Sequence, residues 1–420
     1  MYRLTRLQNG LTVATAEMPH MASISLGVWV GVGGRHEPAG LNGVSHFIEH
    51  MLFKGTATRS AREISQAVEG IGGNSNAFTG EENTCFYAKA RHDRLPVLLD
   101  VLMDMFCNSR FERTEIDKER DVIKEELAMV LDEPDQHVQE LLNETIWPDH
   151  PLGRPLTGTE KSLDGLGRAA LLKYLRAHYV AVNTLIVGAG RLGHGQLLKA
   201  VAPYARRLGQ GRRPAFLPAN GAQTAPKFKL HTRDTAQTQI ALGFRACSRH
   251  DDRRFALRLL NVMLGENTSS RLFQVIREDH GLAYSIHSST ALLDDTGLLA
   301  VSAGLDTGKL PQSLRLIMRE LKNFTEQPPG AAELRRARDY RIGQLDLSLE
   351  NTENQMMWIG EQLLGYGKVF SPAEVKQKLA EVTAGQIRAV AREFFRPERM
   401  SLAVVSPLKS GETLKKLLRF

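Results

Sequence analysis

Apolar and polar residues alternate along two distant stretches of the chain, residues 25–30 and 239–244, as they do in β-strands with one buried face. Two further features recur in the same order at an offset of about 215 residues. They are a helix that opens with Leu-Pro, at 95–96 and 310–311, and a helix that leads into an apolar strand, at 185–187 and 402–405. Three matches at one offset are typical of a duplicated unit. The sequence therefore predicts two halves that share one fold.

A segment rich in Gly, Pro, Ala, Arg and Gln, residues 209–226, interrupts the apolar periodicity. We interpret it as a linker between an N-terminal half, 1–208, and a C-terminal half, 227–420. Strands and amphipathic helices alternate irregularly within each half, and the hairpin signal at 8–10 favours antiparallel pairing. The predicted fold class is α+β, with two similar α/β sandwich halves, each a mainly antiparallel sheet with helices packed on one face.

Composition narrows the class of protein but not its reaction. A chain of 420 residues exceeds one compact core, and its 42% hydrophobic and 24% charged residues are typical of a globular protein. No apolar run is long enough to span a membrane and the first residues do not resemble a secretory signal, so we expect a cytoplasmic protein. Three widely spaced cysteines favour a reducing compartment. The net charge of +7 is dispersed along the chain, so we expect no nucleic-acid partner.

The segment 41–53 carries the pattern with the clearest chemistry. On a helix its apolar residues define one arc, and His46, Glu49 and His50 fall on the opposite arc. Two histidines four apart can offer two imidazole nitrogens to one tetrahedral metal ion, with the acid beside the open position. This inverted H-x-x-E-H arrangement predicts one zinc ion per chain, held by His46 and His50, with Glu49 deprotonating the attacking water. A solvated polar face with chance histidines is the alternative.

A catalytic zinc ion needs a third protein ligand. The helix predicted over 115–130 offers Glu119 and Glu126, which lie seven apart inside the apolar arc, whereas Glu125 faces solvent. The apolar arc consists of Ile116, Val122, Ile123, Leu127, Met129 and Val130. An acid that faces a core is costly unless it is paired or binds a metal, and pairing with Arg or Lys is the alternative here. We assign Glu126 as the third ligand and Glu119 as an acid that hydrogen-bonds a ligand histidine or orders the site.

These motifs resemble those of the pitrilysin, insulinase and mitochondrial processing peptidase family, specifically its short bacterial-type members of about 420 residues. The resemblance covers essentially the whole chain. The matching stretches are 46–56, 74–79, 119–126, 150–155, 269–273 and 281–284. The resemblance implies two similar halves, a chamber made of four such halves, and unfolded peptides or presequence-like segments as substrates. Two short chains would complete that chamber as a homodimer, or as a heterodimer with a related subunit.

The resemblance also implies substrate-binding residues. One group matches a family strand whose edge pairs with an extended peptide, although an ordinary edge strand has the same composition. That group is Asn76, Ala77, Phe78 and Thr79. Arg277 and Tyr284 match residues that contact the peptide and the tetrahedral intermediate, and in family members of twice this length they come from the last quarter of the chain. From the residues alone, an Arg at a helix end and a Tyr in a strand need no such role.

The second half has lost the metal residues, because His46, Glu49 and His50 correspond to positions near Asn261, Leu264 and Gly265 in the duplicated frame. The predicted function is that of a zinc metalloendopeptidase, a hydrolase that cleaves peptides in an enclosed chamber. Two alternatives remain. One is a non-catalytic structural or substrate-presenting subunit of the same fold, which the intact zinc motif disfavours. The other is a peptide-binding module stabilised by zinc, which the lack of a fourth protein ligand disfavours.

Overall fold

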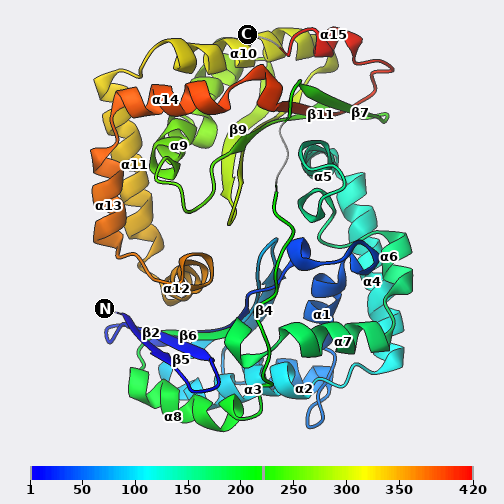
Figure 1. The fold of residues 1–420 in the computed structure, drawn as a ribbon, viewed down its shortest axis with the longest axis vertical. Coiled ribbons are helices and arrows are strands. Elements are labelled where there is room, and N and C mark those ends of the chain that lie inside the picture. The colour runs from blue at the N-terminus through cyan, green and yellow to red at the C-terminus, as the bar shows by residue number, and fades with distance from the viewer. Residues whose placement is uncertain (1, 220–222, 419–420) are drawn as a thin grey trace. The chain divides into compact units, whose positions relative to one another are not determined.

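The computed structural model describes residues 2–219 and 223–418, which form two compact units (Figure 1). The first unit takes residues 2–128, 154–217 and 347–369. The second unit takes the described parts of 129–153, 218–346 and 370–418. Each unit therefore includes a segment from the other half of the chain, 347–369 in the first unit and 129–153 in the second. The predicted halves, 1–208 and 227–420, do not include this exchange of segments.

A six-stranded sheet, as counted in the described part of the chain, organises the first unit. The strand order is β1-β2-β6-β3-β5-β4, with β2 and β6 parallel and the other neighbours antiparallel. The strands are β1 (Tyr2–Arg6), β2 (Thr12–Glu17), β3 (Ser23–Val30), β4 (Asn74–Thr79), β5 (Thr84–Arg91) and β6 (Thr184–Gly190). The central strand β3 is rich in β-branched and aromatic residues, which favour extended backbone. Strand β4 lies at the edge of the sheet.

The second unit contains a five-stranded sheet, again counted over the described residues, with the order β7-β11-β8-β10-β9. Its strands are β7 (Lys227–Thr232), β8 (Thr238–Ala246), β9 (Ala283–Leu292), β10 (Gly297–Leu305) and β11 (Met400–Ser406). β7 and β11 are parallel and the other neighbours are antiparallel. This order repeats that of β2-β6-β3-β5-β4, strand for strand and with the same directions. The predicted duplication of a mainly antiparallel α/β unit is confirmed.

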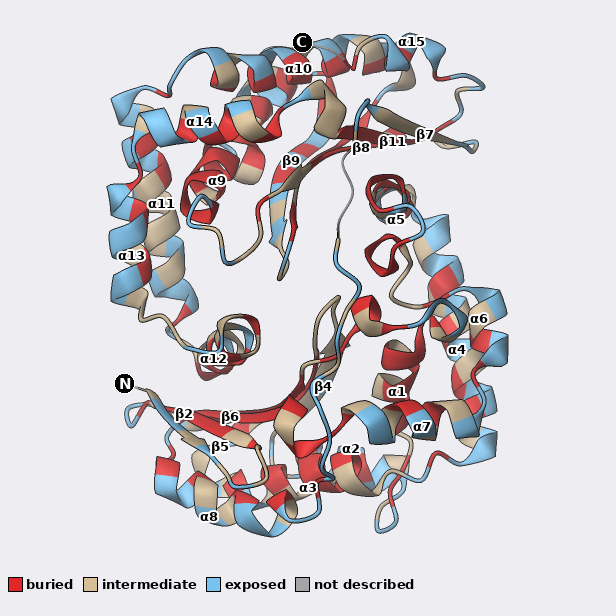
Figure 2. Ribbon diagram, in the orientation of Figure 1, coloured by how far each residue is buried: buried red, intermediate tan, exposed pale blue. Residues whose placement is uncertain are grey.

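Several helices cover one face of each sheet, and in the first unit they bury the larger of its two core clusters (Figure 2). In the first unit these are α1 (Val44–Leu52), α2 (Ala61–Glu69), α3 (Leu95–Asn108), α4 (Arg113–Asp132), α6 (Glu160–Gly165), α7 (Arg168–His178) and α8 (His194–Ala205). In the second unit the helices are α9 (Arg254–Asn261), α10 (Leu310–Glu326), α11 (Ala331–Ser348), α13 (Pro372–Glu381), α14 (Ala384–Phe394) and α15 (Glu412–Lys415). Both α3 and α10 begin with Leu-Pro, because proline lacks the N–H that the first helical turn leaves unpaired.

One helix from the opposite half of the chain covers the second face of each sheet. In the first unit α12 (Thr352–Tyr366) packs on β3 and β6, and its Gly360 lets the backbone approach Trp29 so closely that a Cβ would lie 2.2 Å from the indole ring. In the second unit α5 (Pro134–Ile146) packs on β8 and β11. The expectation of helices on one face only is thus wrong, because residues that point to either side of β3 are buried.

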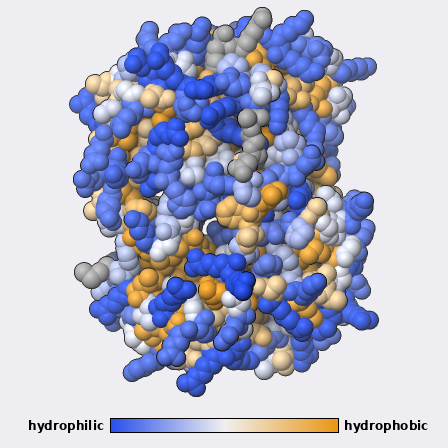
Figure 3. Space-filling view, in the orientation of Figure 1, coloured by the Kyte–Doolittle hydropathy of each residue, from blue (hydrophilic) through white to orange (hydrophobic). Residues whose placement is uncertain are grey.

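The predicted linker has neither helix nor strand at 209–219 and 223–226, and its residues 220–222 lie outside the described part of the chain. Its first portion is fixed to the first unit, where the buried Arg35 lies 3.9 Å from the centre of the Phe216 ring and donates to the Leu217 carbonyl. No helix among the described residues is long and apolar enough to cross a membrane. Hydrophilic residues cover much of the face shown in Figure 3, in line with the dispersed charge of the sequence.

Candidate metal centre

A buried carboxylate fixes the start of α1, the helix with the predicted metal motif. Glu37 is 2% exposed, and its two side-chain oxygens accept hydrogen bonds from the backbone N–H groups of Gly43 (2.7 Å) and Ser45 (2.8 Å). These groups belong to the first turn, whose N–H donors have no partner within a helix. Gly43 itself has φ of 89°, a left-handed conformation that favours glycine. Such a cap contributes about 0.5–2 kcal/mol and sets the rotation of α1.

The apolar arc of α1 is buried as the sequence predicts. Its residues pack into the core of the first unit, and they are Val44, Phe47, Ile48, Met51 and Leu52. His46, Glu49 and His50 are partly exposed on the opposite side of the helix. The rings of His46 and His50 lie edge-on to each other, with centroids 4.6 Å apart, because residues four apart share a helical face.

Helix α4 carries the predicted third ligand. Ile116, Glu119, Ile123 and Leu127 are its buried residues among those described. Glu126 lies beside this row with its side chain 39% exposed, so its carboxylate faces the histidines and not an apolar core. The broader apolar arc predicted for this helix is wrong, since Val122 and Met129 are 43% and 67% exposed. The buried stripe of α4 is narrow because only one row of its residues meets the core.

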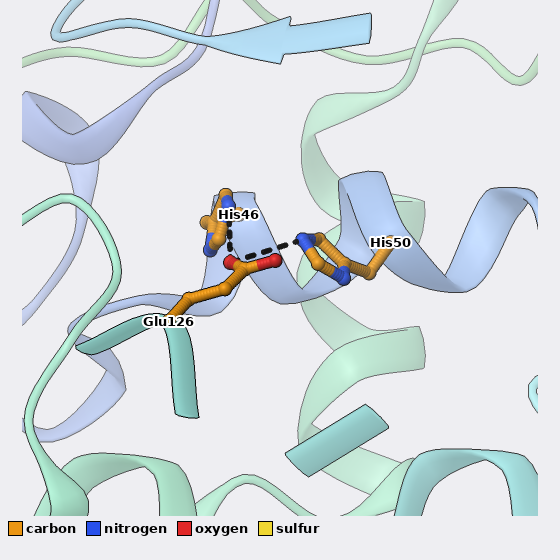
Figure 4. A group of neighbouring side chains, drawn as sticks. All are labelled: His46, His50 and Glu126. Atoms are coloured by element: carbon orange, nitrogen blue, oxygen red, sulfur yellow. Dashed lines mark ion pairs between the residues drawn. The ribbon is translucent and has the colours of Figure 1, made fainter. Parts of the chain in front are cut away.

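The structure brings His46, His50 and Glu126 together (Figure 4). Glu126 Oε2 lies 3.7 Å from His46 Nε2 and 3.6 Å from His50 Nε2, and one ligand atom from each residue lies within 4.8 Å of the others. Zinc ligands at about 2.0–2.1 Å in tetrahedral geometry are about 3.3 Å apart. Burial, together with a smaller effect of the neighbouring His50, lowers the pKa of His46 to about 4, so the His46 ring is neutral with a lone pair to donate. Two imidazole nitrogens and one carboxylate oxygen therefore fit zinc.

Glu119, the predicted supporting acid, contacts one of the two histidines. Glu119 is 4% exposed, and its Oε2 lies 3.0 Å from His50 Nδ1. The other carboxylate oxygen lies 2.6 Å from the ammonium nitrogen of Lys54. In contrast, His46 Nδ1 is buried and has no hydrogen-bond partner within the described part of the chain.

Glu49, the predicted base, is tied to the edge strand β4. The Thr79 hydroxyl donates a 2.6 Å hydrogen bond to Glu49 Oε2. Burial raises the pKa of Glu49, the Thr79 hydrogen bond and His50 lower it, and Glu126 raises it; the net direction is upward. A carboxylate with a raised pKa accepts a proton more readily. The sequence placed Thr79 in a substrate strand but gave no sign of this contact, which joins residues 30 apart.

The other residues predicted to bind substrate lie along β4. Residues 76–79 pair with β5 on one side, and no other described strand pairs with β4. Asn76 is exposed, and its side-chain oxygen accepts a hydrogen bond from Ala77 N at 2.8 Å. Phe78 packs edge-on against Trp29, with ring centroids 5.5 Å apart. β4 thus has a backbone edge on which a further strand could add.

Arg277 and Tyr284 belong to the second unit and lie near each other. Arg277 lies in a π-helix, Phe273–Asp279, and Gly281 with φ of 56° turns the chain into β9, where Tyr284 is 76% exposed. The guanidinium carbon of Arg277 lies 5.8 Å from the centre of the Tyr284 ring. In the position corresponding to the metal motif, the buried Asn261 donates to Glu266 and accepts a hydrogen bond from the Ser288 hydroxyl.

Sequence reasoning missed two residues that organise the site, Glu37 and Lys54. Glu37 precedes α1 by seven positions, and no local motif indicates that its side chain turns back onto the helix. Lys54 follows His50 by four positions, a spacing that puts two residues on the same side of a helix. Its partner Glu119, however, is 65 positions away in the sequence. Their roles depend on tertiary contacts.

Comparison with known proteins identifies the class. Residues 12–160 match the family described as insulinase, peptidase family M16, and residues 165–340 match the peptidase M16 inactive domain. An uncharacterized zinc protease of Streptomyces coelicolor is 37% identical over 98% of this chain and 90% of its own length. An uncharacterized zinc protease of Bacillus subtilis is 36% identical over 95% of this chain and 97% of its own length. The chain belongs to peptidase family M16.

Two solved structures share the fold. A protease from Helicobacter pylori superimposes with a TM-score of 0.91 at 21% identity, covering 97% of this chain and 99% of that one. A structure from Pseudomonas fluorescens described as a peptidase M16 inactive domain gives 0.89 at 18% identity, with the same coverages. These likenesses extend over both units, in agreement with the duplicated architecture.

Replacing Glu126 by Gln should abolish stoichiometric zinc binding, because a neutral amide is a poor ligand where the two imidazoles need an anionic partner. The matched variant Glu125→Gln alters the neighbouring exposed acid and should retain one zinc ion per chain. Metal analysis after dialysis measures both. Equal zinc loss in the two variants, or full zinc in Glu126→Gln, would contradict the assignment of Glu126.

Proposed function

We propose that this protein is a zinc-dependent metalloendopeptidase. The observation that carries the proposal is the convergence of His46 Nε2, His50 Nε2 and a Glu126 oxygen, with Glu49 on the same helical face. A set of three protein ligands leaves a tetrahedral position open, as catalytic zinc sites require, whereas structural sites fill it with a fourth. The zinc-protease names of the relatives support the choice of metal.

The chemical roles follow from the donor set. A zinc ion held there would acidify a water molecule and polarise the scissile carbonyl. Glu49 accepts the proton of the attacking water and returns it to the leaving amine, and Thr79 holds the Glu49 carboxylate in place for both transfers. Glu119 orients the His50 ring.

We propose that substrates bind as extended peptides along β4. Backbone groups at a free sheet edge can pair with any extended chain, which makes recognition tolerant of sequence. Thr79 lies on this strand and also contacts Glu49, so a peptide paired with β4 would run past the base. Folded proteins cannot offer such a segment, so unfolded peptides or presequence-like segments are the expected substrates in an enclosed chamber.

Quenched fluorescent peptides test the function directly. The wild-type chain should cleave them, lose activity with a chelator and regain it when zinc is restored. Glu49→Gln should keep its zinc but lose at least about 100-fold in turnover, the usual size of general-base catalysis.

A stably folded protein should be spared while its unfolded form is cut, and equal rates on both would contradict the enclosed chamber.

The same assay separates the alternatives. Zinc binding without cleavage of any unfolded peptide, in the wild-type chain, would support a non-catalytic presenting subunit or a zinc-stabilised peptide-binding module. The match of the C-terminal half to an inactive domain fits the first of these. It fits an enzyme equally well, because the metal residues found among the described residues all lie in the N-terminal half.

We further propose a homodimer in which Arg277 and Tyr284 of one chain complete the zinc site of its partner. The pair lies together on the second unit, with Tyr284 exposed, so both side chains are available to a substrate. Each chain carries both sets of residues, which a dimer with two shared sites requires. Pairing with a related subunit is the alternative.

Mixing two inactive variants should restore activity. Glu49→Gln lacks the base, and the double variant Arg277→Ala, Tyr284→Phe lacks the pair, so each mixed dimer has one intact site. With free exchange half the dimers are mixed, and recovery should approach about a quarter of the wild-type rate. Light scattering first confirms association and exchange. No recovery from subunits that do exchange would show that the site is completed within one chain.

A further inference from the structure

Lys54 is a charged residue next to the candidate metal centre with no part in the chemistry above. It follows α1 directly, and its ammonium nitrogen lies 2.6 Å from Glu119 Oε1. We propose, on the basis of the zinc site proposed above, that Lys54 is a positioning residue that sets zinc affinity by holding Glu119 against His50.

Glu119 is a buried acid that needs a polar partner. Its side chain is 5% exposed, and a buried carboxylate without a partner is strongly destabilising. Lys54 is the only cation other than histidine paired with Glu119 among the described residues. The ammonium group lies against Oε1, so Oε2 is the oxygen that faces His50 Nδ1.

The contact with Glu119 selects the tautomer of His50. A carboxylate oxygen only accepts hydrogen bonds, so the 3.0 Å contact between Glu119 Oε2 and His50 Nδ1 places a proton on Nδ1. Nε2 then carries the lone pair, and Nε2 is the atom that lies 3.6 Å from the Glu126 carboxylate. The Lys54–Glu119 pair therefore presets His50 for metal binding.

The hydrogen bond with Glu119 supports His50 but not the other ligand histidine, His46. His46 Nδ1 has no hydrogen-bond partner within the described residues, so packing alone orients that ring. Removing the support of His50 would leave both histidines without a fixed tautomer. The affinity for zinc should depend on Lys54 for this reason.

Backbone hydrogen bonds fix the position of Lys54 in the fold. Its N–H donates to Met51 O at 3.2 Å, and the next carbonyl, Gly55 O, accepts from Arg110 N at 3.1 Å. These bonds tie the turn after α1 to the segment before α4. The backbone thus holds the base of the Lys54 side chain within reach of Glu119.

Zinc affinity, measured by competition with a chromophoric chelator on the full-length protein, tests the proposal. Lys54→Met should weaken zinc binding about 10-fold, the lower end of the 10–100-fold range for loss of a ligand histidine's own partner, because Lys54 acts through Glu119. Lys54→Arg should restore most of the affinity, because it keeps the cation. Lys118→Met removes an exposed lysine paired with Glu115 at 2.7 Å and should leave the affinity unchanged.

A double variant and a spectrum exclude a merely structural effect. In a Glu119→Gln background, Lys54→Met should cause no further loss, because its effect passes through Glu119. Histidine-selective ¹⁵N NMR of the zinc-free protein should show His50 protonated at Nδ1 in the wild type and a tautomer mixture in Lys54→Met. Should Lys54→Met fail to fold, Lys54→Gln, which also lacks the cation, is measured in its place.

The outcomes separate this proposal from the proposed function. A wild-type chain that binds no zinc overturns the metal site itself. A wild-type chain that binds one zinc ion, with an affinity for Lys54→Met or Lys54→Gln within twofold of it, overturns the role of Lys54 alone. Additive losses in the double variant, or an unchanged His50 tautomer, would also contradict it.

Discussion

The site depends on one geometric constraint, that ligand atoms from two helices must lie close enough together to coordinate a single metal ion. On α1 the four-residue spacing places His46 and His50 side by side on one face, but the spacing is useful only if the helix presents that face to α4. The buried arc of α1 and the carboxylate of Glu37 at its first turn fix the rotation. On α4 the buried row that contains Glu119 fixes the rotation that brings Glu126 to the histidines. Packing and chemistry are thus set by the same residues.

Buried and partly buried acids recur around this helix pair, and each has a distinct partner. Glu37 accepts backbone N–H groups, Glu119 lies between a lysine and a histidine, and Glu49 accepts from Thr79. Carboxylates are costly to bury, so the buried Glu119 and the partly buried Glu49 beside two histidines indicate a functional site. The second unit has the same sheet order but an Asn261–Glu266 contact in place of a metal motif.

Much of this architecture is predictable because its signals are local. Strand alternation and helical spacing predict the two halves, and the recurrence of 25–30 at 239–244 predicts that they share one fold. The two strands, β3 and β8, occupy equivalent positions in the two sheets. The same periodicity gave the faces of α1. The helical phase also led to Glu126, although Glu126 faces the histidines and not a core, and Val122 and Met129 proved exposed.

The remainder depends on contacts between distant residues. Amphipathic spacing shows that α12 and α5 have apolar faces but not which sheet each will cover, so their exchange between the two units could not be foreseen. The contacts of Lys54 with Glu119 and of Thr79 with Glu49 likewise join segments 65 and 30 positions apart. Such pairs leave no periodic trace in one sequence.

The central claim is that one zinc ion is bound by two imidazoles and a carboxylate. X-ray absorption at the zinc edge of the purified, zinc-loaded chain measures the ligands directly. The account predicts about four nitrogen and oxygen neighbours at about 2.0–2.1 Å, with the outer-shell scattering of two imidazole rings. A sulfur shell at about 2.3 Å, or a spectrum without imidazole scattering, would contradict it.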